Sequence, residues 1–359
     1  MKLAAALAMP LFALAVVTAL EVAQSTREAD EVGSESDLAR AATGQRGLIT
    51  ALENERNWAA VELSGVADTV EAEVEGYDAT RAQTDAAVTA FRARLAGEER
   101  AVREAFQPAL DALSELRAVR ADIDGYTGAK TPGNAISSEI YDRYAAMLQP
   151  LLDANSLVVS AIDNPELREG ASLVDLATRQ AQVHADLARL VVVAVTLGGG
   201  VDTPQEITDI SQARASFDRN NGDILDASEP YDRLIDELFP QAVVDLMAEE
   251  VDAAITTGTA DVARILEAND TYADGYPGMR DELAEMVLDR ADNLRHDAEV
   301  HQRWFILLAA ATLVAALVIT WLVSRSITRP LRSLTRQATA MADHRLPEAV
   351  LDILDTPLG

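Results

Sequence analysis

The chain has 359 residues, of which 49% are hydrophobic and only 4% aromatic, and its formal net charge is −29. Such an acidic excess argues against nucleic acid as a partner, since binding phosphate backbones requires a basic face. The absence of cysteine excludes a disulfide framework and, with only four histidines, argues against a zinc site. No cofactor-binding motif is visible, so we expect no cofactor.

The chain begins with an apolar segment from Leu3 to about Val22, which follows Lys2 and contains one charged residue, Glu21. About 20 apolar residues are enough for a helix to span the hydrocarbon core of a bilayer. We therefore predict a transmembrane helix over residues 1–24. A cleaved signal peptide is the alternative, although the apolar stretch is long for one and no clear small-x-small cleavage site follows Leu20.

Residues 25–302 are predicted to form an all-α domain of helical bundles, because helical periodicity recurs between breakers and no segment alternates with period 2. Acidic residues are concentrated in this part of the chain. The predicted helical blocks are, in chain order, 37–64, 78–106, 108–124, 137–163, 165–197, 204–217, 229–256, 260–273 and 279–303.

The stretch LITALENERNWAAVEL carries an arginine on its apolar helix face. Four apolar residues share that face: Leu48, Leu52, Ala59 and Leu63. Arg56 falls on the same face, so helical spacing directs its guanidinium toward the core. A buried arginine is costly unless a carboxylate or a bound anion pairs with it, and its planar fork suits a small planar oxyanion. An ion pair with a neighbouring helix, or snorkelling to the surface, is the alternative.

The same stretch, LENERNWAAVELSG, resembles the signature of the nitrate- and nitrite-sensing (NIT) domain, whose first long helix carries a Leu-Gln-x-Glu-Arg-Gly motif. Glu55 and Arg56 match this motif, whereas Glu53 replaces its Gln and Asn57 replaces its Gly. The resemblance implies that Arg56 contacts a small anion, nitrate or nitrite, inside a pair of helical bundles.

A second basic motif of that family would fall near residues 178–190. The resemblance therefore adds Arg179, His184 and Arg189 as candidate ligand-binding residues, with His184 standing where an arginine is usual. The similarity in layout covers residues 40–300 and extends to the sensor portion of actinobacterial histidine kinases that carry this domain.

A calcium site is a weaker alternative in the stretch DRNNGDILDASE. Asp218, Asn220, Asp226 and Glu229 stand at offsets 1, 3, 9 and 12 of a calcium loop. The glycine stands at offset five rather than six, where only glycine tolerates the sharp turn cheaply. An acidic loop before a helix explains the same residues, and we predict no metal site.

A second apolar segment, from Trp304 to Val323, contains no charged residue. Trp304 and Trp321 lie near its ends, where interfacial aromatic residues are expected. We predict a second transmembrane helix over residues 303–324, with a buried helix of a soluble protein as the alternative. The arginines that follow it, together with Lys2, predict that both termini are cytoplasmic and that residues 25–302 lie outside the cell membrane.

The tail, residues 325–359, resembles the first part of a HAMP linker. It has an apolar seam with spacing 4, 3, 4, 3, typical of a coiled coil, formed by Ile327, Leu331, Leu334, Ala338 and Met341. Such a seam implies a homodimer, while a basic helix bound to anionic membrane lipid is the alternative. Because the chain ends at Gly359, before a full second helix, we expect it to be a fragment of a longer gene product.

No phosphate-binding loop, nucleophile elbow or ATP-binding signature is visible, so no catalytic residue is assigned. The features together predict a transmembrane receptor, the sensor half of a two-component histidine kinase that senses a small anion such as nitrate or nitrite. A chemotaxis-type receptor and a non-signalling helical surface protein are the alternatives.

Overall fold

The computed structural model describes residues 46–64, 77–98, 100–130, 135–197 and 200–340, together with 16–41 apart from 18, 21, 25, 28, 31 and 35. These residues form helices joined by turns, and no strand occurs among them, which confirms the predicted all-α fold. Two compact units result, one comprising Gly33–Leu294 and the other Met1–Val32 with Arg295–Gly359. The elements are α2 (Arg46–Ser64), α3 (Tyr77–Leu95), α4 (Arg100–Ala105), α5 (Gln107–Ala112), the 3-10 turn η2 (Leu113–Glu115), α6 (Leu116–Asp124), α7 (Ala135–Ser160), α8 (Pro165–Leu197), α9 (Pro204–Leu225), α10 (Asp232–Leu238), α11 (Gln241–Thr257) and α12 (Val262–Ala340).

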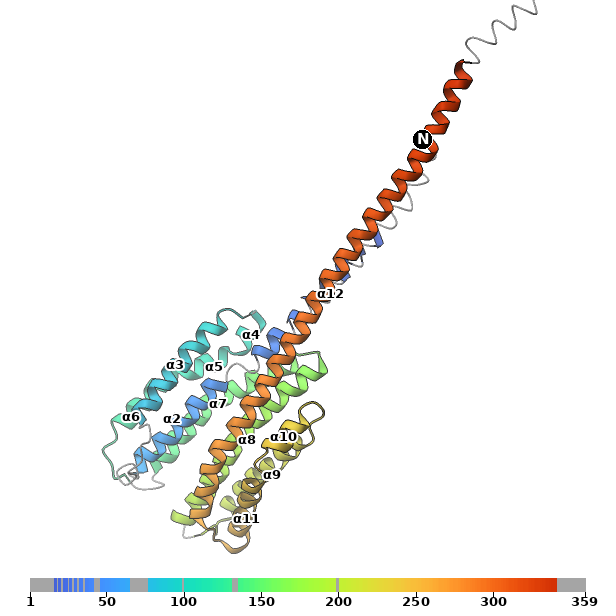
Figure 1. Cartoon of the computed structure of the whole chain (residues 1–359). Helices are drawn as coiled ribbons and strands as arrows, with labels where there is room; N and C mark the ends of the chain where they lie inside the picture. The colour runs from blue at the N-terminus through green and yellow to red at the C-terminus, as the bar shows by residue number, and fades with distance from the viewer. Residues whose placement is uncertain are drawn as a thin grey trace, which may run out of the picture. The chain divides into compact units, whose positions relative to one another are not determined.

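The first half of the unit Gly33–Leu294 is a bundle centred on α2 and α7. Helix α2 packs against both α3 and α7, while the short helices α4, α5 and α6 pack along α7 (Figure 1). Helix α3 buries residues at three- and four-residue spacing, among them Val88, Phe91 and Leu95. The ring of Phe91 meets that of Phe106 edge to face, with centroids 5.6 Å apart. Periodic apolar faces thus hold the bundle together.

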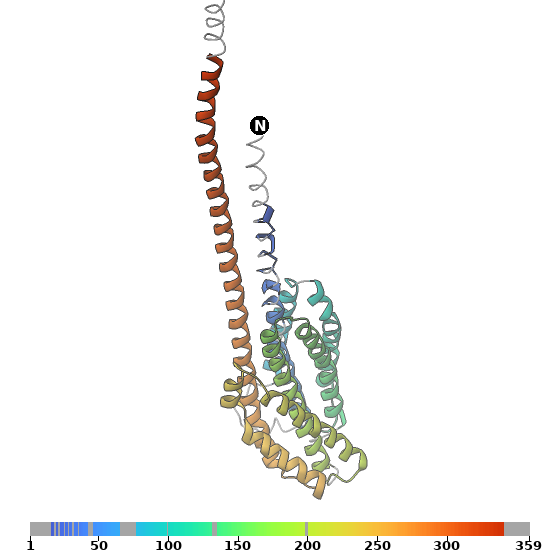
Figure 2. The ribbon, with the colours of Figure 1, turned by 90° about the vertical axis from the view of Figure 1, so that its right-hand side faces the viewer.

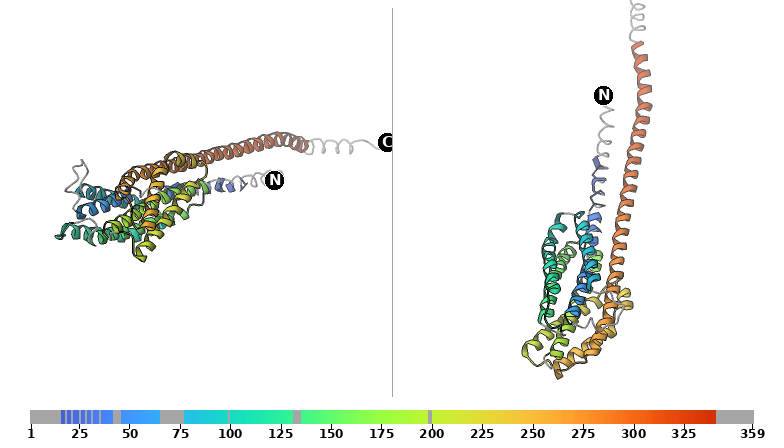
Figure 3. Two further views of the ribbon diagram at one scale, coloured as in Figure 1. Left: turned by 90° about the horizontal axis from the view of Figure 1, so that it is seen from below. Right: turned by 90° about the vertical axis from the view of Figure 1, so that its left-hand side faces the viewer.

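The second half is a bundle of α8, α9 and α11, with α8 also packing against α7 (Figure 2). Helix α9 starts with a capping box, in which the Thr203 hydroxyl accepts from the Glu206 amide and the Glu206 carboxylate accepts from the Thr203 amide. The first part of α12 belongs to this unit, and its Leu283 and Val287 are fully buried. Within each bundle the helices lie side by side, as two further views show (Figure 3).

Two predicted helix ends are wrong, because the helix continues past both. The block predicted to end at residue 217 runs on through residues 220–222 to Leu225, and residues 274–278, between the predicted blocks 260–273 and 279–303, lie inside α12. Asn221 is buried, and its side-chain oxygen accepts hydrogen bonds from Gln180 (2.8 Å) and Tyr276 (2.5 Å). These tertiary contacts outweigh the cost of about 1 kcal/mol that glycine carries in a helix. Conversely, the predicted blocks 78–106 and 229–256 are interrupted, by the turn after α3 and by Phe239-Pro240.

In the other unit, α12 continues through an apolar segment. Within the described part of the chain, one helix is long and apolar enough to cross a membrane, at Tyr276–Leu322. Its large apolar side chains are exposed, Trp304 at 69% and Leu308 at 66%. For the first predicted span, residues 1–15 lie outside the described residues, while Val17 and Leu20 are exposed. The helix reaches Ala340, and the rest of the predicted HAMP segment lies outside the described residues.

Candidate functional site

Arg56 lies in the core between helices α2, α7 and α8, as its place on the apolar face predicts. Its side chain is 1% exposed, and its Nη1 donates to Oε1 of Gln182 on α8 at 2.7 Å. The guanidinium carbon lies 4.2 Å from the centroid of the Tyr141 ring on α7. Among the described residues Arg56 forms no ion pair, and its Nε has no hydrogen-bond acceptor. A buried cation with an unused donor is costly unless an anion joins it.

Gln182 links Arg56 to a carboxylate. While its Oε1 accepts from Arg56, its Nε2 donates to Oε1 of Glu53, one turn before Arg56 on α2. Burial raises the pKa of Glu53, and the positive charges of Arg56 and Arg280 act against that rise. The neutral carboxylic acid is therefore more favoured at this position than for a glutamate in water.

Arg280 brings a second buried guanidinium to the same carboxylate, from helix α12. It is 3% exposed, and its Nη2 donates to the Thr50 hydroxyl of α2 at 2.8 Å. Its Nε lies 3.5 Å from the Asp281 carboxylate but has no hydrogen-bond acceptor among the described residues. Arg280 also lines a cavity of about 650 Å³ together with Thr50 and Asn54 of α2 and Arg94 of α3.

Tyr141 joins a further arginine to the cluster. The guanidinium carbon of Arg189 lies 4.6 Å from the Tyr141 ring centroid, so the ring contacts two guanidinium groups. Its hydroxyl donates to Asp186 at 2.9 Å, and burial raises the pKa of the phenol, which keeps it protonated. Arg189 also lies 3.7 Å from Asp142. Of the residues predicted from the second basic motif, Arg189 is the one that shares a partner with Arg56.

Arg179 and His184 lie elsewhere on α8. Arg179 donates to the Asp175 carboxylate at 2.9 Å and to the Leu152 carbonyl at 2.7 Å, which ties α8 to α7. His184 is buried, with its ring centroid 5.9 Å from that of Phe217 on α9, and burial lowers its pKa to about 3. It stands two residues after Gln182, which at 100° per residue places it on the opposite face of the helix. Their ligand roles stay predictions.

The residues of the calcium alternative do not form a loop. Asp218 and Asn220 lie within helix α9, and Asp226 follows its last residue. Asp218 is ion-paired with Arg214, and Glu229 with Arg233 at 2.9 Å. Across the described part of the chain, no group of three or more acidic, histidine or cysteine side chains could hold a metal ion.

Glu55, the other charged residue of the helix motif, has a structural role that the sequence did not reveal. It is fully buried and accepts hydrogen bonds from Arg120 Nε at 2.7 Å, Arg120 Nη2 at 2.8 Å and the Tyr144 hydroxyl at 2.7 Å. The contacts tie α2 to α6 and α7. Glu55 therefore fixes the rotation of α2, which aims Arg56, the next residue, toward α8.

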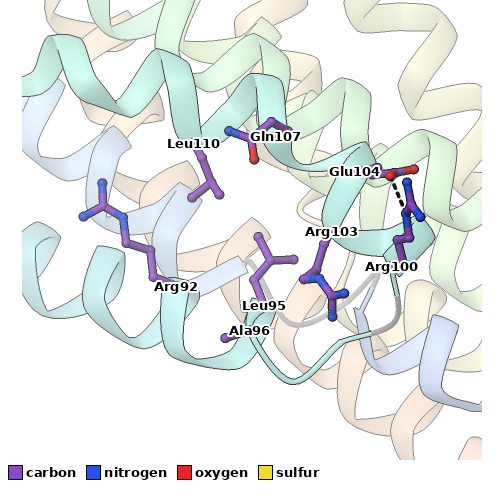
Figure 4. A pocket seen from close by; sticks show the side chains of 8 residues that line it. All are labelled: Arg92, Leu95, Ala96, Arg100, Arg103, Glu104, Gln107 and Leu110. Carbon is purple, nitrogen blue, oxygen red and sulfur yellow. Dashed lines mark hydrogen bonds and ion pairs between the residues drawn. The ribbon is translucent and has the colours of Figure 1, made fainter.

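Another arginine-lined cavity, of about 740 Å³, lies at the corner between α3 and α4. Figure 4 shows Leu95 and Leu110 between Arg92 on one side and Arg100 and Arg103 on the other. Arg100 is exposed and pairs with Glu104 at 2.7 Å (Figure 4). Surface charges of this kind are screened by water and contribute little to binding. The buried cluster around Arg56 is the stronger candidate.

Gln182, Arg280, Glu53 and Tyr141 were not among the predicted ligand-binding residues. A signal for Arg280 was present, because it precedes Ala284, Val287 and Ala291 at apolar helical spacing, the same pattern that identified Arg56. Gln182 and Arg189 are seven residues apart and therefore share a helix face. No pattern in the sequence indicates that these faces meet α2.

Residues 47–288 match a family model described as nitrate and nitrite sensing, and this range contains Arg56, Gln182 and Arg280. Among solved structures, the NasR transcription antiterminator is similar, with a TM-score of 0.56 and 16% sequence identity over 92% of this chain and 90% of that one. At this identity the likeness concerns the fold alone. No curated protein matches the chain.

Proposed function

We propose that this chain, which belongs to the nitrate- and nitrite-sensing family, binds nitrate or nitrite beside Arg56, between helices α2, α8 and α12. The observation that carries the proposal is a buried guanidinium without an ion pair and with its Nε unused. A planar oxyanion of single charge matches the planar fork of donors that arginine presents.

Gln182 and Arg280 complete the proposed site. The Gln182 amide can turn its Nε2 donor from Glu53 to the anion, and Arg280 adds a second positive charge from α12. Tyr141 supports the Arg56 guanidinium from α7. Because the groups come from both bundles, an anion bound here favours one packing of the bundles over another, which is how a ligand shifts a conformational equilibrium.

We further propose that the chain is a membrane receptor with two spans, residues 1–24 and 303–324, an outer domain at 25–302 and cytoplasmic termini. The exposed apolar segment of α12 supports this reading. The seam after Arg325 supports a homodimer with a HAMP-type relay at 325–359, and a histidine kinase is the output that its sequence layout favours. A chemotaxis-type output remains the alternative, because the outer domain would serve either one equally.

Calorimetric titration of the full chain in lipid nanodiscs tests the anion site. The parent is expected to bind nitrate or nitrite, and Arg56→Ala to weaken binding at least about 100-fold, since hydrogen bonds to charged groups contribute about 1.5–3 kcal/mol each. Arg233→Ala, which removes an exposed arginine paired with Glu229, is the matched control and should bind as the parent does.

A parent that binds neither anion would overturn the proposal, as would full affinity in Arg56→Ala. If circular dichroism shows that Arg56→Ala does not fold, Arg56→Lys takes its place. Lysine keeps the charge but lacks the fork, so affinity should still fall about tenfold or more.

A further inference from the structure

We infer that the anion site takes up as much as one proton with each anion it binds, depending on pH, because the carboxyl of Glu53 lies where its negative charge opposes an anion held by Arg56 and Arg280. The inference rests on the proposed function and adds a regulation to it: the receptor responds to the anion and to acidity together.

The geometry places Glu53 inside the cluster. Its Oε1 accepts from Gln182 Nε2, and Gln182 Oε1 accepts from Arg56 Nη1 at 2.7 Å. The charges of Arg56 and Arg280 both act on it. An ionised Glu53 is thus an internal anion that holds the Gln182 Nε2 donor and interacts with the same positive charges as an incoming nitrate.

Among the titratable groups on the helices around the site, Glu53 is the one whose protonation we expect to change when the anion binds. On α2 and α12 the neighbouring charges are Arg56 and Arg280, with Asp281 beside Arg280. On α7, Tyr141 has its pKa raised by burial and stays protonated. On α8, Gln182 is neutral, and Asp186 accepts a hydrogen bond from the Tyr141 hydroxyl. Arg189 of the same helix lies close to Asp142. His184 packs on Phe217, and its pKa is about 3.

The sign of the effect follows from the charges. Burial raises the pKa of Glu53, and the two arginines limit the rise by favouring the carboxylate. The negative charge of a bound nitrate offsets the positive charge of the two arginines, so the pKa of Glu53 rises further in the complex. By linkage, a group whose pKa is higher in the complex takes up a proton on binding.

The pH dependence has three regions. Below the pKa of Glu53 in the unliganded site, the carboxyl is already neutral and the affinity does not change with pH. Between that pKa and the higher pKa in the complex, the dissociation constant rises with pH, by up to about tenfold per unit for one linked proton. Above both values the affinity is again constant and low.

Titration of nitrate into the full chain in nanodiscs, at several pH values from about 5 to 8.5, tests the inference. Buffers with different ionisation enthalpies report the number of protons taken up. Glu53→Gln keeps the size and a hydrogen-bonding group but cannot titrate, so we expect it to bind tightly at all these pH values and without proton uptake. Glu62→Gln makes the same change on the same helix, at a half-exposed position paired with Lys130, and should retain the pH dependence of the parent.

The outcomes separate this inference from the proposed function. Nitrate binding by the parent that does not vary with pH, or pH dependence that persists in Glu53→Gln, would overturn the inference and leave the anion site standing. Binding by Glu53→Gln alone would support the inference, because it shows the carboxylate excluding the anion. Binding by neither protein at any pH would overturn the proposed function, and the proton linkage with it.

Discussion

At the scale of single residues, Gln182 decides how two charged side chains of α2, Glu53 and Arg56, are held. Its amide accepts from Arg56 on one side and donates to Glu53 on the other, so a neutral side chain separates a cation from a carboxylate. This arrangement leaves Arg56 without a direct ion pair and with an unused Nε donor. Under the proposed function, these are the features that an anion would use.

Replacing the Gln182 amide by a carboxylate should prevent the anion from binding. In Gln182→Glu the new charge pairs with Arg56 and acts as a permanent internal anion. A charge within about 4 Å at an effective dielectric constant near 20 is worth about 4 kcal/mol, so nitrate affinity at neutral pH should fall well over tenfold. The control is Gln212→Glu, which adds the same charge at an exposed position of α9. Unchanged affinity in Gln182→Glu, measured by calorimetry, would show that the anion does not bind beside Gln182.

Glu55 has the opposite role, since its charge is fully used by Arg120 and Tyr144. Glu55→Gln breaks a buried pair and leaves Arg120 with the exposed Asp85 as its partner. We expect a loss of about 2–3 kcal/mol in the free energy of unfolding, less than the full cost of a broken buried pair because Asp85 remains. Urea denaturation of the detergent-solubilised chain checks this, with Glu62→Gln, at the surface, expected to change stability by less than about 1 kcal/mol. Equal losses of unfolding free energy in both variants would show that Glu55 does not have this structural role.

At the scale of helices, the glycines mark where elements approach closely and where they do not. A Cβ at Gly170 of α8 would lie 2.3 Å from the Tyr231 hydroxyl oxygen and 2.5 Å from Cγ2 of Val287 on α12. A Cβ at Gly222 of α9 would meet nothing within 4 Å. Gly170 therefore permits the close contact between α8 and α12, whereas Gly222 can be replaced by a larger residue without a clash.

The two alanine variants should therefore have opposite effects on stability. Gly170→Ala should destabilise the chain by about 1–3 kcal/mol, because Tyr231 and Val287 must shift. Gly222→Ala should stabilise it by about 0.5–1 kcal/mol through helix propensity. Thermal unfolding followed by circular dichroism compares the two. A stabilising Gly170→Ala would mean that α8 and α12 are not in this close contact.

The helix patterns of the sequence predicted the α-helices from α2 to α12 as helical but not the 3-10 turn η2, and the bounds of α8 agree at both ends. The breaks near Gly222 and Gly278 were wrong because local propensity was outweighed by burial of Asn221 and Tyr276 between helices. Of the site, Arg56 could be predicted, since its own helix face is apolar. The apolar face of Arg280 gave the same signal, but the meeting of Gln182 and Arg280 with α2 could not be predicted, because it depends on how three helices distant in sequence pack.

At the scale of the whole molecule, the proposed topology places the outer domain and the tail on opposite sides of a membrane. The chain has no natural cysteine, so a single introduced one reports its own location. With a membrane-impermeant thiol reagent on intact cells, a cysteine at Ser211, exposed on α9, should be labelled and one at Thr356 should not. Both should be labelled after permeabilisation. Labelling at Thr356 in intact cells would contradict the two-span topology.

The proposed function requires a small planar anion to bind at the buried guanidinium of Arg56, with Arg280 beside it. A crystal structure of the chain grown with nitrate would show whether it does. We expect planar density for a three-oxygen group within hydrogen-bonding distance of Arg56, with the Gln182 amide turned toward it, and no such density in crystals of Arg56→Ala. Nitrate density confined to other places, such as the exposed cavity lined by Arg92 and Arg100, with Arg56 still bonded only to Gln182, would contradict the claim.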